Sequence, residues 1–356
     1  MNKKRLFIVI AFMAVLLCGC GDHELENRSF PLAVGMEKEE EDCLLVFNFP
    51  VLSEVANENA DGSDTTQAMV RGRDFFTMQK DYEKNNSKRI DLSHNKALIL
   101  SVDFLKDEEK LQNFVDYTMN QELMARNTYL FVTDMPMEEL FSLDKNLEKP
   151  LGTYLEELLE SDEDYKNKQI MTLGKLYDER ANQMETLYIP VLGAQDARPA
   201  VIASYVLKDG KALKEVPVLR AMDSLFIQGK LSGESYEDDK GRQWRLNRIK
   251  PSYEFERDGE KMKLKVEISC EAALENGSIT DWRKQEEAEK KLGAELGKYL
   301  TEAAKQSKKS GFDLTNSYKK LANRDRKSYT YFEERGGYVE ALETEIVVDA
   351  KIVNVK

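Results

Sequence analysis

The first twenty residues decide in which compartment this chain would fold. Lys3, Lys4 and Arg5 precede a run of 12 residues without a charge, from residue 6 to residue 17. A membrane-spanning helix needs about 20 apolar residues, so this run is too short to span, but it fits the apolar core of a signal peptide. We therefore expect residues 1–19 to be a signal peptide and the rest to fold outside the cytoplasm.

The end of the apolar run carries a lipoprotein cleavage pattern. Leu17 is aliphatic at position −3, Gly19 is small at −1, and Cys20 follows the cleavage point. A cysteine thiolate is the nucleophile needed to form a thioether with a diacylglycerol donor. We expect cleavage after Gly19 and an N-acyl, S-diacylglycerol cysteine at Cys20, with a free amino group as the alternative to the N-acyl chain. Two acyl chains hold a protein firmly, whereas one binds only marginally. The alternative is an ordinary secretory signal with an incidental cysteine.

The charge balance of the chain excludes one class of partner. The mature chain of 337 residues keeps 49 of the 52 basic residues against 65 acidic ones, a net charge of −16. Nucleic acid binding needs Lys and Arg contacts to phosphate, so we expect no nucleic acid partner. Anionic lipid should repel so acidic a body, which leaves attachment to the lipid on Cys20. The length allows two or three domains.

The cysteines and histidines offer little chemistry. After Cys20, only Cys43 and Cys270 follow, 227 residues apart. We expect two separate buried thiols, and a disulfide is the alternative outside the cytoplasm. His23 lies in the tether and His94 in a predicted turn, which are too few ligands for a zinc site, and no Gly-x-Ser-x-Gly elbow is present. We expect a hydrogen-bonded structural His94, no catalytic residue, no metal and no cofactor.

The mature chain is predicted to be an α+β protein of several domains, with mixed or antiparallel sheets each flanked by helices. A lipidated tether covers residues 20–29, and an N-terminal α+β domain covers 30–135. Asp64 and Asp103 are expected to cap helices, since Asp is a favoured N-cap. The helices expected in this domain are 65–83 and 104–120, and the strands are 30–36, 43–52, 89–92, 97–102 and 128–133.

A middle region of helices and one strand is predicted over residues 136–198. Its helices are expected at 136–143, 150–160 and 168–180, and its strand at 186–192. Pro190 predicts an edge position for that strand, because proline cannot donate to a sheet. Residues 195–199 are interpreted as a linker to the next domain.

The C-terminal α+β domain is predicted over residues 199–356. The Asp209-Gly210 and Asp258-Gly259 pairs are typical of hairpin turns, and apolar residues alternate with polar ones from Met262 to Cys270, as in a sheet with one buried face. A long helix at 281–309 should cross an antiparallel sheet. Its Gly293 and Gly297 would let that sheet approach closely. The alternation from residue 338 to 355 predicts a last strand.

The order of several segments resembles a known family. Cys20 to Glu26, followed by Phe30 to Glu37, is similar to the start of the Ger(x)C spore germination lipoproteins. Ile90 to Leu100 resembles their Leu-x-His-x-Lys strand pair, and Ser310 to Leu314 resembles the end of their long charged helix. The chain differs from the family pattern at Gly21, which stands in place of a tryptophan.

The resemblance implies the C subunit of a nutrient germinant receptor. Such a subunit is a lipoprotein on the outer face of the spore's inner membrane, beside integral-membrane A-type and B-type subunits, with a multi-domain α+β fold and no known active site. Two other classes stay open from the residues: an extracytoplasmic solute-binding lipoprotein of a transporter, and a surface hydrolase using His94. The Asp-Gly hairpins argue against the solute-binding class, which would need parallel sheets in two lobes.

Overall fold

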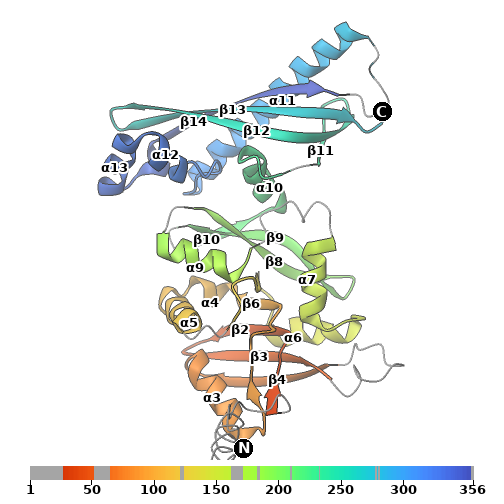
Figure 1. The fold of residues 1–356 in the computed structure, drawn as a ribbon, viewed down its shortest axis with the longest axis vertical. Helices are drawn as coiled ribbons and strands as arrows, with labels where there is room; N and C mark the ends of the chain where they lie inside the picture. Colours follow the sequence, from red (N-terminus) through yellow and green to blue (C-terminus); the bar gives the residue numbers. More distant parts are fainter. Residues whose placement is uncertain are drawn as a thin grey trace, which may run out of the picture.

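The computed structural model describes residues 27–51, 65–120, 124–161, 171–182, 185–208, 211–231, 233–276, 279 and 281–353. In these residues the strands form one sheet of eight, one sheet of four and a short pair, β1 (Arg28–Ser29) with β5 (Arg89–Ile90). The eight-stranded sheet and its helices lie at one end of an elongated molecule, and the four-stranded sheet lies at the other (Figure 1). The predicted α+β class with helix-flanked sheets is confirmed.

The eight-stranded sheet is parallel in its centre and antiparallel at both sides. Its order is β10-β9-β8-β7-β6-β2-β3-β4, and β2, β6, β7 and β8 run parallel. All five residues of β6 are buried, as expected for a strand covered on both faces. The strands are β2 (Ala33–Glu39), β3 (Asp42–Pro50), β4 (Thr65–Gly72), β6 (Ala97–Ser101), β7 (Tyr129–Thr133), β8 (Leu187–Gln195), β9 (Arg198–Lys208) and β10 (Lys211–Val216).

Helices cover both faces of this sheet. On one face, a core that includes Val34 and Leu98 packs against α3 (Phe75–Asn85), α4 (Val102–Lys106), α5 (Glu108–Asn120) and α9 (Leu173–Asn182). On the other face, a core that includes Ala33 and Ile99 packs against α6 (Met137–Ser142) and α7 (Leu151–Ser161), which are joined by the short η2 (Leu143–Asn146). Alternate residues of one strand thus serve two separate cores.

The helix predicted at 65–83 is wrong in its first half. Residues 65–72 form β4, which pairs antiparallel with β3, and α3 begins only at Phe75. Asp74, not Asp64, caps that helix by accepting from the Thr77 backbone at 2.8 Å. Ala68 and Gly72 match a helical spacing with Phe75, but backbone pairing with β3 decides the conformation. The predicted helix 104–120 is also divided, and Ser101 rather than Asp103 caps its first part.

The linker predicted at 195–199 is a hairpin turn. Asp196 and Ala197 join β8 to β9 with φ angles of 50° and 57°, the backbone of a tight type I′ turn. The domain boundary predicted between residues 198 and 199 therefore falls inside this hairpin, and the sheet continues to Val216. The edge position predicted from Pro190 is wrong as well, because β8 lies between β7 and β9. Pro190 precedes the pairs that join β8 to β7, which begin at Val191.

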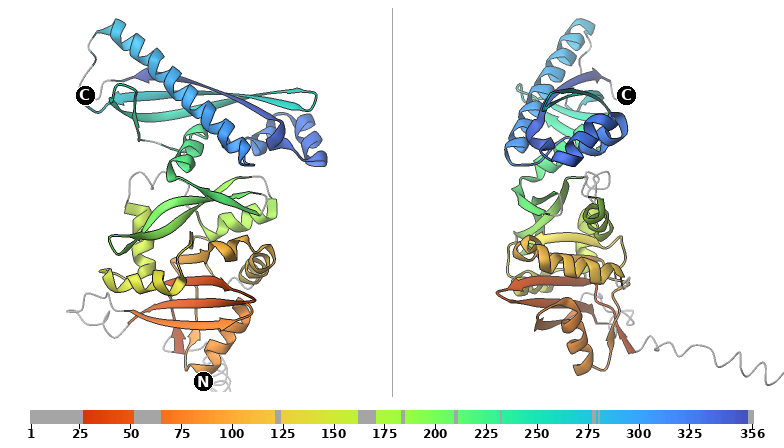
Figure 2. Two further views of the ribbon diagram at one scale, coloured as in Figure 1. Left: turned by 180° about the vertical axis from the view of Figure 1, so that it is seen from behind. Right: turned by 90° about the vertical axis from the view of Figure 1, so that its left-hand side faces the viewer.

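The four-stranded sheet has the order β11-β12-β13-β14, and α11 (Trp282–Lys309) crosses it, as the view from behind shows (Figure 2). Its strands are β11 (Glu234–Glu237), β12 (Gln243–Asp258), β13 (Lys261–Leu274) and β14 (Leu342–Ile352). The hairpin at Asp258-Gly259 is confirmed, with Gly259 at a φ of 63°. The predicted alternation is confirmed too, since Met262 and Cys270 and the apolar residues between them are buried.

The last strand corrects the expected antiparallel sheet. β14 runs parallel to β13, in register from Met262 with Leu342 to Ala272 with Ile352. Four helices return the chain between these strands, the crossover that a parallel pair requires. After α11 they are α12 (Tyr318–Arg324), α13 (Arg326–Arg335) and α14 (Tyr338–Ala341), and α14 occupies the predicted start of the strand. A further helix, α10 (Val218–Ile227), connects the two sheets.

Candidate functional site

Most sequence-predicted chemical residues are dispersed. Cys20 and His23 lie outside the described residues. Cys43 and Cys270 are free and buried, which confirms two separate thiols, and burial raises the pKa of both. Among the described residues, no group of three or more His, Cys, Asp or Glu side chains is placed to hold a metal ion. In the same part of the chain, no helix is long and apolar enough to cross a membrane.

His94 is placed in a turn at the surface. Its ring stands edge-on to Phe30, with 5.3 Å between the ring centroids. In the same turn Asp91 accepts from Ser93 and from Arg28 at 2.8 Å. Burial alone would raise the pKa of Asp91, but the bonds from Ser93 and Arg28 lower it. The Arg28–Asp91 contact thus fixes the start of the described chain to the turn that carries His94.

The polar residues that the structure brings together lie at the junction of the two sheets. Asn316 accepts from the Thr186 backbone N–H at 3.0 Å and donates to its carbonyl at 3.4 Å. Ser224 donates to the Leu314 carbonyl at 2.7 Å, and Phe312 meets Tyr188 edge-on. All these contacts join residues that lie at least 90 positions apart in the sequence. The Asn316 and Phe312 contacts hold the four-stranded unit to the start of β8.

A buried carboxylate organises this junction. Asp313 accepts four hydrogen bonds, from the backbone and hydroxyl groups of Thr315 and Ser317, at 2.5 to 2.8 Å. The Ser317 hydroxyl also lies 2.7 Å from that of Tyr338, whose pKa burial raises well above its ordinary value. Asp313 is 4% exposed, so these donors replace water around its charge. The spacing Asp313-x-Thr315-x-Ser317 is the sequence signal that could have identified this turn.

Basic side chains surround the outer side of the junction. Lys319 pairs with Glu185 at 2.7 Å, and the Lys320 ammonium lies 3.4 Å from the centre of the Tyr253 ring. Burial, together with the nearby charge of Lys230, lowers the pKa of Lys320 to about 8. The Lys319–Glu185 ion pair joins the two units, whereas the Lys320–Tyr253 contact joins α12 to β12 inside the four-stranded unit.

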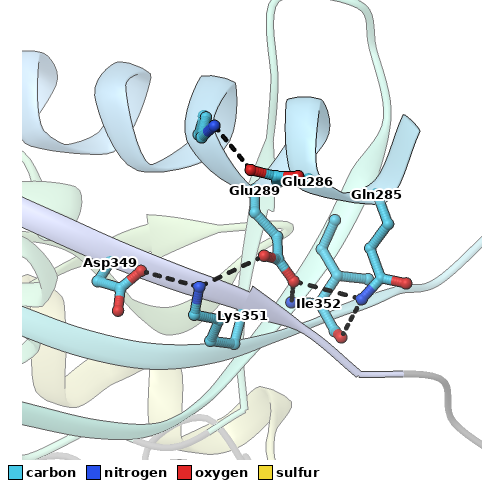
Figure 3. Close-up of polar contacts among 7 residues, drawn as sticks. Gln285, Glu286, Glu289, Asp349, Lys351 and Ile352 are labelled. Carbon is cyan, nitrogen blue, oxygen red and sulfur yellow. Dashed lines mark hydrogen bonds and ion pairs between the residues drawn. The ribbon is translucent and has the colours of Figure 1, made fainter. Parts of the chain in front are cut away.

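The edge of β14 is covered by α11 (Figure 3). Glu289 accepts from the Ile352 backbone N–H at 2.9 Å, and Gln285 donates to the Ile352 carbonyl at 3.2 Å. Thr301 makes the same kind of contact at Ile346. A Cβ atom at Gly293 would lie 2.4 Å from the Val348 carbonyl oxygen. The predicted close approach of the sheet to the helix glycines is confirmed. The helix covers the edge of β14, which would otherwise be exposed to pairing with another strand.

The comparisons with known proteins agree with this architecture. The family model of the spore germination protein N-terminal domain matches residues 21–194, and that of the "Spore germination B3/ GerAC like, C-terminal" domain matches residues 204–356. The chain belongs to the GerAC-like family of spore germination proteins. The family resemblance expected from the sequence is therefore confirmed. A search of curated proteins gave no match.

A solved structure shares the fold of this GerAC-like chain. It is the crystal structure of the GerBC protein, with 10% sequence identity and a TM-score of 0.56. The match covers 90% of this chain and 97% of the other, so it includes both sheets. The two family models meet between residues 194 and 204, at the β8–β9 hairpin, whereas the eight-stranded sheet continues through β10.

Proposed function

We propose that this chain is a membrane-anchored lipoprotein subunit of a spore nutrient germinant receptor, needed for receptor assembly or signalling. The observation that carries the proposal is the match of both family models, in order, over residues 21–194 and 204–356. The likeness in fold to GerBC supports it. The subunit acts through protein–protein contact with integral-membrane A-type and B-type subunits, and we assign it no catalytic step.

The anchor in this proposal is the lipid on Cys20. The Leu17, Gly19 and Cys20 pattern supports cleavage after Gly19 and an N-acyl, S-diacylglycerol cysteine. The protein would then be held on the extracytoplasmic face of a membrane, which in a spore is the outer face of the inner membrane. The net charge of −16 supports attachment by lipid, since the body as a whole is repelled by anionic lipid.

Deletion of the gene tests the receptor role. We expect spores to lose germination in response to a subset of nutrients, because a receptor subunit serves only its own receptor. Sporulation and germination by non-nutrient agents should stay normal. The measurement is the fall in optical density of purified spores exposed to each nutrient. Unchanged germination to every nutrient would contradict the proposal.

Cys20→Ala tests the anchor, and Cys18→Ala is its matched control two residues away. The Cys20 variant lacks the thiol that accepts the diacylglycerol, so it should leave the membrane fraction. The Cys18 variant keeps Leu17, Gly19 and Cys20 and should stay with the membrane. Fractionation and metabolic labelling with a radioactive fatty acid measure both. Membrane retention and labelling of the Cys20 variant would exclude lipidation at this residue.

A further inference from the structure

One helix face differs in charge from the rest of this acidic protein. Along α3 and the segment that follows it, the exposed residues contain four cations, one large apolar side chain and no acidic residue. They are Phe76, Thr77, Lys80, Lys84, Asn85, Asn86, Ser87, Lys88 and Arg89. We name this set the α3 face.

The acidic residues of the same segment lie further from the surface. Asp81 and Glu83 pair with Lys84 and Lys80, at 2.9 and 3.1 Å, and each carboxylate is less exposed than its lysine: 47% against 72%, and 14% against 48%. Within the described residues, Lys88 and Arg89 make no ion pair. The outermost layer of the α3 face is thus cationic, although the chain carries a formal net charge of −13.

An apolar side chain stands at the start of the α3 face. Phe76 is 47% exposed, and its ring rests edge-on against Tyr117, with 5.4 Å between the ring centroids. Helices that lie in the interface of a bilayer combine aromatic side chains with Lys and Arg, and the α3 face presents both kinds of residue. Phe76, Lys80 and Lys84 follow one another at a spacing of four, so they share one stripe of the helix.

The described part of the chain begins beside this face. β1 pairs parallel with β5, and Arg28 lies opposite Arg89 in that register. Asn27 follows Cys20 by seven positions, and seven extended residues span at most about 25 Å. Figure 1 shows α3 at the end of the molecule opposite the four-stranded sheet.

We propose that the α3 face lies against the anionic lipid headgroups of the bilayer that holds Cys20. The cations meet lipid phosphates, Phe76 enters the interface, and the four-stranded sheet points away from the membrane. This inference rests on the proposed lipid anchor and adds an orientation to it. The four exposed cations of the α3 face give an otherwise acidic body one surface suited to anionic lipid.

The test measures which end of the protein touches lipid. The mature chain from Cys20 is coupled through that cysteine to a maleimide phospholipid, so the result does not depend on lipidation by the cell. A keto amino acid is placed at Thr77 or, in a separate protein, at the exposed Ser252 of β12, and a dye is attached to it. Vesicles of phosphatidylglycerol and phosphatidylcholine carry a headgroup quencher.

The dye at position 77 should be quenched several-fold more than the dye at position 252, and the difference should shrink in phosphatidylcholine alone or in high salt. Lys80→Glu with Lys84→Glu and Lys88→Glu should remove the difference. The matched control is Lys284→Glu with Lys290→Glu and Lys298→Glu on α11, which changes the net charge equally and should keep it. Circular dichroism verifies that both triple variants fold.

Two results would overturn the orientation. One is equal quenching at positions 77 and 252 on anionic vesicles. The other is a difference that survives the three α3 substitutions and high salt, which would assign the contact to the short tether or to another protein surface. Failure of the proposed anchor is seen separately, in the cell fractionation of the Cys20→Ala protein.

Discussion

At the scale of the residue, Asp223 is a carboxyl group that folding moves out of water. Arg220 and Tyr299 donate hydrogen bonds to it at 3.0 and 3.1 Å. Burial nevertheless raises its pKa from 3.8 to about 7, against the opposing charge of Arg220. The folded state keeps a proton that the unfolded chain releases near pH 4, so this group's contribution to stability falls as the pH rises from about 4 to about 7.

Asp223→Asn should flatten this part of the pH profile, because the amide does not titrate. Urea unfolding across that range measures the effect. Asp238→Asn is the contrasting variant: burial would raise the pKa of Asp238, but bonds from Trp244 and Arg242 lower it to about 2. The wild-type Asp238 carboxylate stabilises the fold above its unfolded pKa, and this stabilisation is lost as the pH falls toward about 2. A wild-type slope in the Asp223 variant would contradict the assignment.

At the scale of the element, α11 and β14 form one unit through backbone contact. Gly293 and Gly297 face the carbonyl oxygens of Val348 and Ile346, where a Cβ atom would lie 2.4 and 2.9 Å away. Side chains on either side of these glycines satisfy the strand's outer hydrogen-bonding groups, as Figure 3 shows for Gln285. The glycines are thus needed for packing, since glycine costs up to about 1 kcal/mol relative to alanine inside a helix.

Gly293→Ala should lower the free energy of unfolding. Overpacking usually costs roughly 1–3 kcal/mol, and the higher helix propensity of alanine offsets part of that cost. Gly297→Ala is the matched control, with the same helix gain but a less severe contact. It should therefore cost less. Denaturant unfolding of both variants gives the comparison. If both substitutions stabilised the protein, the close approach of α11 to β14 would be disproved.

At the scale of the whole molecule, the junction makes the two sheets one body. The core of the four-stranded unit includes Val206 of β9 and Val216 of β10, so apolar packing is continuous between the units. Asn316 adds two hydrogen bonds to the Thr186 backbone. Its φ is 50°, a conformation that asparagine tolerates better than most residues. In the proposed receptor role, such a body would transmit a displacement from one end to the other.

Asn316→Ala should leave the buried Thr186 N–H without a partner, at a cost of about 1–3 kcal/mol. Asn316→Gly keeps the backbone conformation and loses the same bonds, so it separates the two effects. We expect the Ala variant to cost more than the Gly variant, and calorimetry to show a broader or divided transition in both. Full wild-type stability in both variants would show that the junction depends on apolar packing alone.

The direction of the strands in the structure does not argue against a solute-binding protein. β13 pairs parallel with β14, and the centre of the eight-stranded sheet is parallel. The family match, rather than sheet direction, separates the two classes.

Local pattern alone determined the features whose cause is local. The alternation from Met262 to Cys270 predicted a strand with one buried face, and Asp258-Gly259 predicted its hairpin. The long helix predicted at 281–309 is α11. These predictions hold because side-chain period and turn chemistry act over a few residues. The family could be inferred as well, since the order of segments is a property of the sequence.

Only the tertiary structure decided the features that depend on distant partners. Residues 65–72 are a strand because β3 supplies their hydrogen bonds, and β14 is parallel because four helices return the chain. Asp196-Ala197 carries no glycine to mark its turn, and Asn316 meets a strand 130 residues earlier. The basic α3 face likewise arises from which charges folding leaves outside. Long-range pairing and burial, which no local pattern encodes, decide all of these.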